Sequence, residues 1–139
     1  MKNEEFAAAR VNSYRREESV LHKKSYAFAV RITKMFLQCS SNDWKLMAIY
    51  KQILRSGTSI SANVHESEFA QSQADFINKL SVSLKEANET DYWLNLLKDT
   101  DYIDEKSFLS MEEDCGELIA LLVSSIKTVK NNIVKDKEL

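Results

Sequence analysis

Few residues of this chain belong to the types that carry out metal or nucleophilic chemistry. There are two cysteines, Cys39 and Cys115, and two histidines, His22 and His65. The cysteines do not form a Cys-x-x-Cys pair, and the histidines cannot complete a plausible zinc set with them. The Glu-x-x-His pattern of di-iron bundles does not occur either. The sequence therefore predicts no metal and no other cofactor, and it favours partly exposed surface positions for both histidines.

Arg16 and His22 have a spacing that some small helical ribonucleases use. In such a pair the histidine can act as a general base. The match is short and lies in a basic N-terminal segment, so chance explains it better than catalysis does. We therefore expect no catalytic residues and no small-molecule substrate, with a ribonuclease as the least favoured alternative.

Basic side chains form a second candidate site. At about 100° per residue, five of them fall within roughly a third of the circumference of one helix. Such a stripe can neutralise the phosphates of RNA or DNA without reading bases. The alternative is a solvated face whose charges form ion pairs within the protein. The five residues are Arg16, Lys23, Lys24, Arg31 and Lys34.

Apolar side chains beyond those needed for a core form the third candidate site. Tyr26, Val30 and Leu37 lie to one side of the apolar seam of the first helix, and Tyr92 and Trp93 add two large rings further along. Exposed patches of this kind commonly mark subunit contacts. The sequence therefore favours self-association, with a wider core as the alternative.

The composition indicates which elements hold these residues. The chain of 139 residues contains two glycines and no proline, so it has few tight turns and favours long helices over strands. The formal net charge is −2, which is not typical of a strong polyanion binder. The absence of a signal peptide and of any apolar run of about 20 residues predicts a cytoplasmic protein with reduced thiols and no membrane contact.

Apolar periodicity predicts four amphipathic helices joined by short links. The first begins at Ser19 and keeps a heptad-like seam to Cys39, and Asp43 is a plausible cap for the second. Ser72 and Asp104 are plausible caps for the third and fourth. Four such helices form an all-α, antiparallel up-down-up-down bundle. The predicted helices span about 19–39, 44–67, 73–99 and 105–130.

The bundle is expected to form one domain over residues 19–132. Residues 1–18 would be an N-terminal arm or loose helix, and the polar tail 133–139 would fray.

Small and hydroxyl residues interrupt the second predicted helix between Arg55 and Asn63. Taken alone, this segment is typical of a turn, but the apolar spacing on both sides favours a continuous helix. A glycine there costs up to about 1 kcal/mol against alanine, so we expect a neighbouring backbone to pack closely against Gly57. Without a preceding strand or a final lysine, the segment is not a phosphate-binding loop. It predicts a structural contact between helices.

This same segment, Arg-Ser-Gly-Thr-Ser-Ile-x-Ala-Asn, resembles the signature of the four-helix bundle family related to proteins encoded in 23S rRNA intervening sequences. The signature positions are Arg55, Ser56, Gly57, Thr58, Ser59 and Asn63. Further matches are Ser25-Tyr26-x-Phe28-Ala29, Asp75-Phe76-Ile77, Leu84-Lys85-Glu86-Ala87, Tyr92-Trp93-Leu94 and Asp114-Cys115-x-Glu117-Leu118.

The resemblance implies an antiparallel four-helix bundle that assembles as a ring-like homopentamer. The chain is also similar to the accessory variability protein of diversity-generating retroelements, which associates with nucleic acid through a basic surface. We therefore expect a non-enzymatic, bacterial, oligomeric protein that binds nucleic acid in a ribonucleoprotein. The alternative is a structural protein–protein interaction module that binds no nucleic acid.

Overall fold

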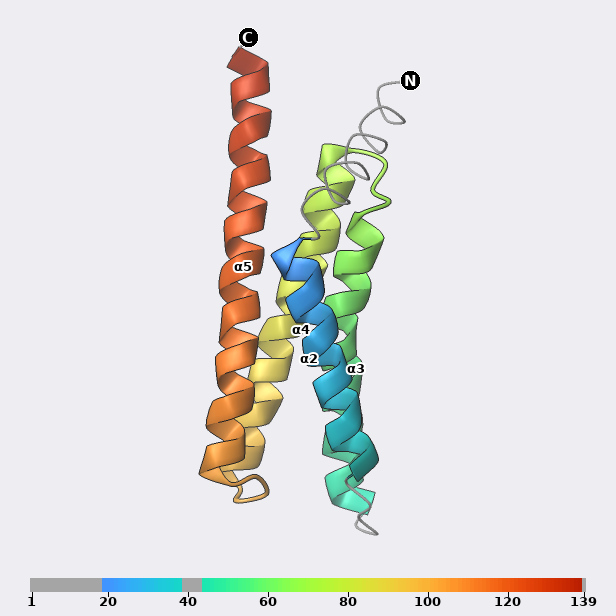
Figure 1. Cartoon of the computed structure of the whole chain (residues 1–139), viewed down its shortest axis with the longest axis vertical. Helices are drawn as coiled ribbons and strands as arrows, with labels where there is room; N and C mark the ends of the chain where they lie inside the picture. Colours follow the sequence, from blue (N-terminus) through green and yellow to red (C-terminus); the bar gives the residue numbers. More distant parts are fainter. Residues whose placement is uncertain (1–18, 39–43, 139) are drawn as a thin grey trace.

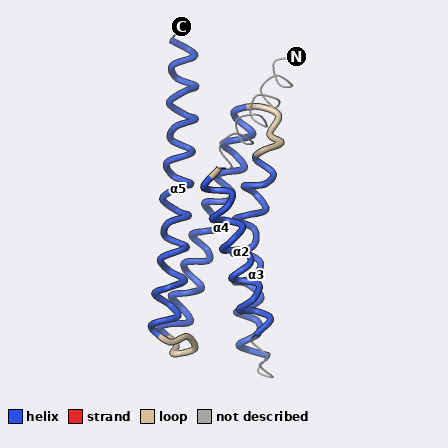
Figure 2. Tube along the Cα trace, viewed as in Figure 1, coloured by secondary structure: helices blue, strands red, loops and turns tan. Residues whose placement is uncertain are grey.

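The computed structural model describes residues 19–38 and 44–138, and this part of the chain is all-α, with no strand (Figure 2). It contains four helices, which confirms the predicted fold class. They are α2 (Val20–Gln38), α3 (Trp44–Ser67), α4 (Gln73–Asp99) and α5 (Glu105–Glu138). The predicted arm at 1–18, the end of the first predicted helix at Cys39 and the predicted cap Asp43 lie outside the described residues.

The helices run alternately up and down, each packed against the next one along the chain (Figure 1). The chain thus visits the four positions of the bundle in order, and α2 and α4 occupy diagonal positions. Contact between α2 and α5 is much less extensive than between the other neighbours. Figure 1 shows the C-terminal part of α5 rising away from the other described helices.

Apolar residues at helical spacing fill the interior, as the periodicity predicts. On α2, Phe28 and Ile32 are buried, and on α3, Ile53 and Ile60 are completely enclosed. Burial of these stripes is the main source of stability, because no single helix can remove its apolar side from water. Helices α4 and α5 contribute the other part of the core, which includes Phe76, Leu80, Ala87, Leu94, Leu97, Phe108, Met111, Cys115, Leu118 and Leu122.

Side-chain caps fix the starts of the last two helices. The Ser72 hydroxyl accepts a hydrogen bond from the Asp75 amide at 3.0 Å. Asp104 accepts one hydrogen bond from the Ser107 amide at 2.8 Å and another from the Ser107 hydroxyl at 2.9 Å. These two hydrogen bonds lower the pKa of the Asp104 carboxyl. Both caps satisfy amides that a helix start leaves open. The sequence prediction of both caps is confirmed.

Helix α3 is continuous through the segment of small residues, as predicted. The close neighbour of Gly57 is, however, not a backbone. A β-carbon on Gly57 would lie 3.0 Å from Cγ1 and 3.1 Å from Cγ2 of Ile32. The expectation of backbone packing was therefore wrong, because a branched side chain from α2 occupies the space.

Helix α5 includes residues 133–138, for which the sequence favours a frayed tail. Lys135 and Lys137 lie in its last turn, where positive charge interacts favourably with the helix dipole. None of the helices described in the structure combines the length and apolarity needed to cross a membrane.

Candidate functional site

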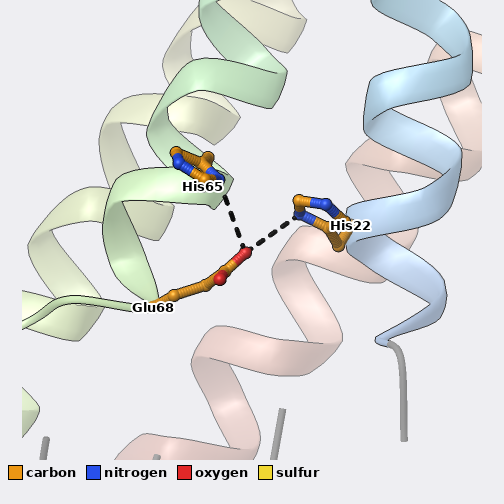
Figure 3. A group of neighbouring side chains, drawn as sticks. All are labelled: His22, His65 and Glu68. Atoms are coloured by element: carbon orange, nitrogen blue, oxygen red, sulfur yellow. Dashed lines mark ion pairs between the residues drawn. The ribbon is translucent and has the colours of Figure 1, made fainter. Parts of the chain in front are cut away.

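Two histidines and a glutamate converge where the start of α2 meets the end of α3. The two helices are antiparallel neighbours, so His22 in the first turn of α2 comes beside His65 near the end of α3. Glu68 follows in the turn after α3, where its amide donates to the His65 carbonyl at 3.2 Å. Figure 3 shows all three side chains pointing toward a common point.

The glutamate carboxylate lies between the two imidazoles. Its Oε1 atom is 3.1 Å from Nδ1 of His22 and 3.7 Å from Nδ1 of His65 (Figure 3). The Glu68 side chain is 13% exposed, whereas that of His65 is 61% exposed. The two imidazole rings have centroids 6.1 Å apart. The group therefore has one well-buried anionic member and one ring that solvent can reach.

An open cavity of about 510 Å³ adjoins this cluster. Both histidines belong to its lining, together with hydroxyl-bearing and small residues of α2 and α3. Most of its surface is apolar, and its polar side-chain groups are the two imidazoles and three hydroxyls. The other lining residues are Tyr26, Ala29, Thr58, Ser61 and Ala62.

Sequence reasoning missed this cluster. The sequence predicts two separate surface histidines, because it contains neither a cysteine–histidine zinc set nor a Glu-x-x-His motif. The chain carries the reverse order, His65-x-x-Glu68, which also places both side chains on one side of a helix end. The third member, His22, is distant in sequence, so only the packing of α2 on α3 brings it to the pair.

The predicted basic stripe lies partly against α5. Lys24 forms an ion pair with Glu117, and Arg31 forms one with Asp114 at 2.7 Å. Arg31 also donates to the Ser110 hydroxyl at 2.7 Å. These contacts join α2 to α5, which are less extensively packed than the other neighbouring helices, and they compensate two of the positive charges. Lys23 and Lys34 are exposed, and Arg16 lies outside the described residues.

The signature residues make contacts between helices. Arg55 on α3 forms ion pairs with Glu86 at 3.2 Å and with Glu89, both on α4. These bonds raise the pKa of Arg55 and lower that of Glu89. Asn63, by contrast, bonds within α3, where its side chain donates to the Ser59 carbonyl at 2.8 Å.

The hydroxyls within the signature also bond locally or across α3 and α4. Ser56 is buried and hydrogen-bonded to the Thr90 hydroxyl on α4 at 2.8 Å. Thr58 and Ser59 donate to carbonyls one turn earlier, at 2.6 Å each. Hydrogen bonds of this kind, from a hydroxyl to the carbonyl four residues earlier, satisfy the hydroxyl within its own helix. The segment's described contacts are those of helix packing.

The residues expected at a subunit interface lie on two diagonal helices. On α2, Tyr26 is 61% exposed, Leu37 is more exposed still, and Val30 is half-buried. On α4, Tyr92 is 59% exposed and stacks edge-to-face on Trp93, with ring centroids 5.1 Å apart. Trp93 is half-buried against the core. These residues therefore form two separate apolar patches, and other exposed apolar side chains, such as Trp44, Phe69 and Leu109, lie elsewhere on the described surface.

An acidic pair lies between α4 and α5. Burial and the neighbouring Asp91 raise the pKa of Glu112 to about 7, against the opposing effect of Lys98. Burial likewise raises the pKa of the nearby Cys115 thiol to about 12. The Cys115 thiol donates to the Ala87 carbonyl at 3.4 Å and is enclosed, so it is a core residue and not a nucleophile.

Comparison with known proteins identifies a family and a solved structure that resemble this chain. Residues 17–124 match the family described as 23S rRNA-intervening sequence protein. A crystal structure from Bacteroides thetaiotaomicron, described as a protein of unknown function from the S23 ribosomal protein family, is 53% identical. The match covers 78% of this chain and 99% of that one, with a TM-score of 0.73. Comparison with curated proteins found no match. The chain belongs to the 23S rRNA-intervening sequence protein family.

Proposed function

We propose that this protein is a homo-oligomeric helical scaffold whose subunits bind one another through the exposed apolar residues of α2 and α4. The observation that carries the proposal is the exposure of Tyr26 and Tyr92, each about three-fifths accessible to solvent, on diagonal helices of one bundle. Aromatic residues are enriched in interfaces because they remove much apolar area from water at a small entropic cost.

The diagonal placement favours a head-to-tail assembly. If the α2 surface of one copy binds the α4 surface of the next, each copy uses two different patches. Such heterologous contacts close into a ring when the rotation between copies allows it. This arrangement agrees with the homopentameric ring that the family resemblance implies, and it needs no catalytic step.

Nucleic-acid binding is the competing function, and the charge arrangement supports it less. Lys24 and Arg31 already have acidic partners on α5, which reduces the positive field that the stripe offers to phosphates. If the stripe were nevertheless a backbone-binding surface, a labelled RNA would bind in a strongly salt-dependent way. We expect instead that the fluorescence anisotropy of the labelled RNA stays unchanged at low salt and micromolar protein.

The scaffold proposal is tested by mass measurement in solution. We expect light scattering to give a multiple of the mass of one chain, and Tyr26→Ser or Tyr92→Ser to shift the population toward smaller species. Tyr102→Ser is the matched control, because this exposed tyrosine lies in the link between α4 and α5, outside both patches. A native chain that stays monomeric at tens of micromolar contradicts the proposal.

Mixing the two variants tests the head-to-tail geometry. A Tyr26→Ser chain keeps its α4 patch and a Tyr92→Ser chain keeps its α2 patch, so an equimolar mixture should form one-to-one complexes. Each variant alone should remain smaller than that complex. If either variant alone forms dimers as readily as the mixture does, the contacts are between like patches and the ring model is wrong.

A further inference from the structure

We propose that His22, His65 and Glu68, which meet where the start of α2 lies beside the end of α3, form a binding site for a divalent metal ion such as Zn²⁺. Two imidazoles and one carboxylate are the protein ligands of a well-known type of zinc site that keeps an open position. The same set also binds iron(II) in some oxygenases. This inference goes beyond the scaffold function and does not depend on it.

The spacing of the three donor atoms fits a shared ion. One potential ligand atom from each of His22, His65 and Glu68 lies within 4.8 Å of the other two. With metal–ligand bonds of about 2.0–2.2 Å, neighbouring ligands around zinc lie about 3.3 Å apart. The two distances from Glu68 Oε1, 3.1 and 3.7 Å, bracket this value. The more distant of the two rings, that of His65, is also the more exposed one.

The environment of Glu68 supplies a second, independent reason. Its Oε1 atom is removed from solvent and accepts no hydrogen bond of good geometry from a described residue, although Nδ1 of His22 lies 3.1 Å away. A buried carboxylate oxygen left in this state is costly, because it has lost hydration without full compensation. A cation held between the oxygen and the two imidazole nitrogens would repay that cost.

The adjoining cavity gives the ion an open side. Both histidines line this space of about 510 Å³, so a bound metal would face it with the positions that the protein does not fill. Water or a small anionic ligand fits there. The hydroxyls of Tyr26 and Ser61 are nearby groups of the lining that can donate to such a ligand, whereas the Thr58 hydroxyl already donates to the Leu54 carbonyl.

The test uses the full-length, tag-free chain with Cys39→Ser, so that this thiol cannot bind metal. Zn²⁺ is titrated by calorimetry, and Co²⁺ is titrated with detection of its visible absorption bands. We expect one ion per chain, with affinity lowered at least about tenfold in His65→Gln and in Glu68→Gln. Glu66→Gln should keep full affinity, because Glu66 pairs with Lys79 instead.

A spectroscopic readout separates ligand loss from misfolding. The chain has only two histidines, so the imidazole-nitrogen region of its NMR spectrum contains signals from these two rings alone. We expect both Nδ1 resonances to shift on addition of one equivalent of Zn²⁺. The proposal is overturned if no ion binds at micromolar concentrations, if His65→Gln and Glu68→Gln bind as tightly as Glu66→Gln does, or if only one ring shifts.

Discussion

Gly57 on α3 lies directly beneath Ile32 on α2, so close that a β-carbon at position 57 would come within 3.0 Å of the Ile32 side chain. Ile32 is completely buried and branched at its β-carbon, which leaves it little freedom to move aside. A residue with a β-carbon at position 57 would therefore require the Ile32 side chain or the two helices to shift by a few tenths of an ångström.

Gly57→Ala should destabilise the protein by about 1–3 kcal/mol, because overpacking outweighs the better helix propensity of alanine. Gly116→Ala is the matched control on α5, where nothing lies within 4 Å of the added carbon. It should stabilise the protein by up to about 1 kcal/mol. Chemical unfolding monitored by circular dichroism measures both free energies.

A double substitution tests the cause. In an Ile32→Ala background the space above Gly57 is open, so Gly57→Ala should change sign and become stabilising. If the cost of Gly57→Ala is the same in both backgrounds, contact with Ile32 is not its source.

Glu112 should make the stability of the protein depend on pH. Its pKa is raised to about 7 in the folded state, from an ordinary value of 4.5, through burial and the neighbouring Asp91. Between about pH 4.5 and pH 7, Glu112 therefore keeps its proton in the folded chain and has lost it in the unfolded chain. This contribution to stability is complete below about pH 4.5 and is lost as the pH rises through about 7.

Glu112→Gln removes the titration and keeps an amide that can donate to Asp91. The variant should be more stable than the native chain by about 1 kcal/mol near pH 8, and the gain should vanish near pH 4.5. Urea unfolding across this range measures it. Glu113→Gln is the control, because that neighbouring side chain is exposed. A gain that is equal at both pH values would contradict this origin.

The buried hydroxyl pair between α3 and α4 should behave as one unit. Thr90→Val removes the 2.8 Å partner of Ser56, whose other contact, with the Ile53 carbonyl, is 3.4 Å long. The expected cost is about 1–2 kcal/mol. Thr128→Val on the exposed side of α5 should change the unfolding free energy by far less.

Adding Ser56→Ala to Thr90→Val should cost less than the sum of the two single changes, since no hydroxyl then remains buried without its partner. Strict additivity in a double-mutant cycle would show that the two hydroxyls do not interact. The same denaturant unfolding experiment measures all three variants.

The sequence by itself determined the local structure. Apolar residues at heptad spacing predicted which face of each helix is buried, and the caps Ser72 and Asp104 predicted where two helices begin. These features depend on neighbours within a few positions along the chain, whose geometry a helix fixes. The same reasoning foresaw the continuity of α3 through its small residues.

Only the tertiary structure decided what lies opposite each face. Ile32 above Gly57, Asp114 beside Arg31, and His22 beside His65 and Glu68 are all pairings between residues far apart in sequence. Each depends on the axial shift and rotation of one helix against another, which the summed packing of many side chains determines. A periodic pattern specifies the buried stripe of a helix, but it is equally compatible with several such alignments.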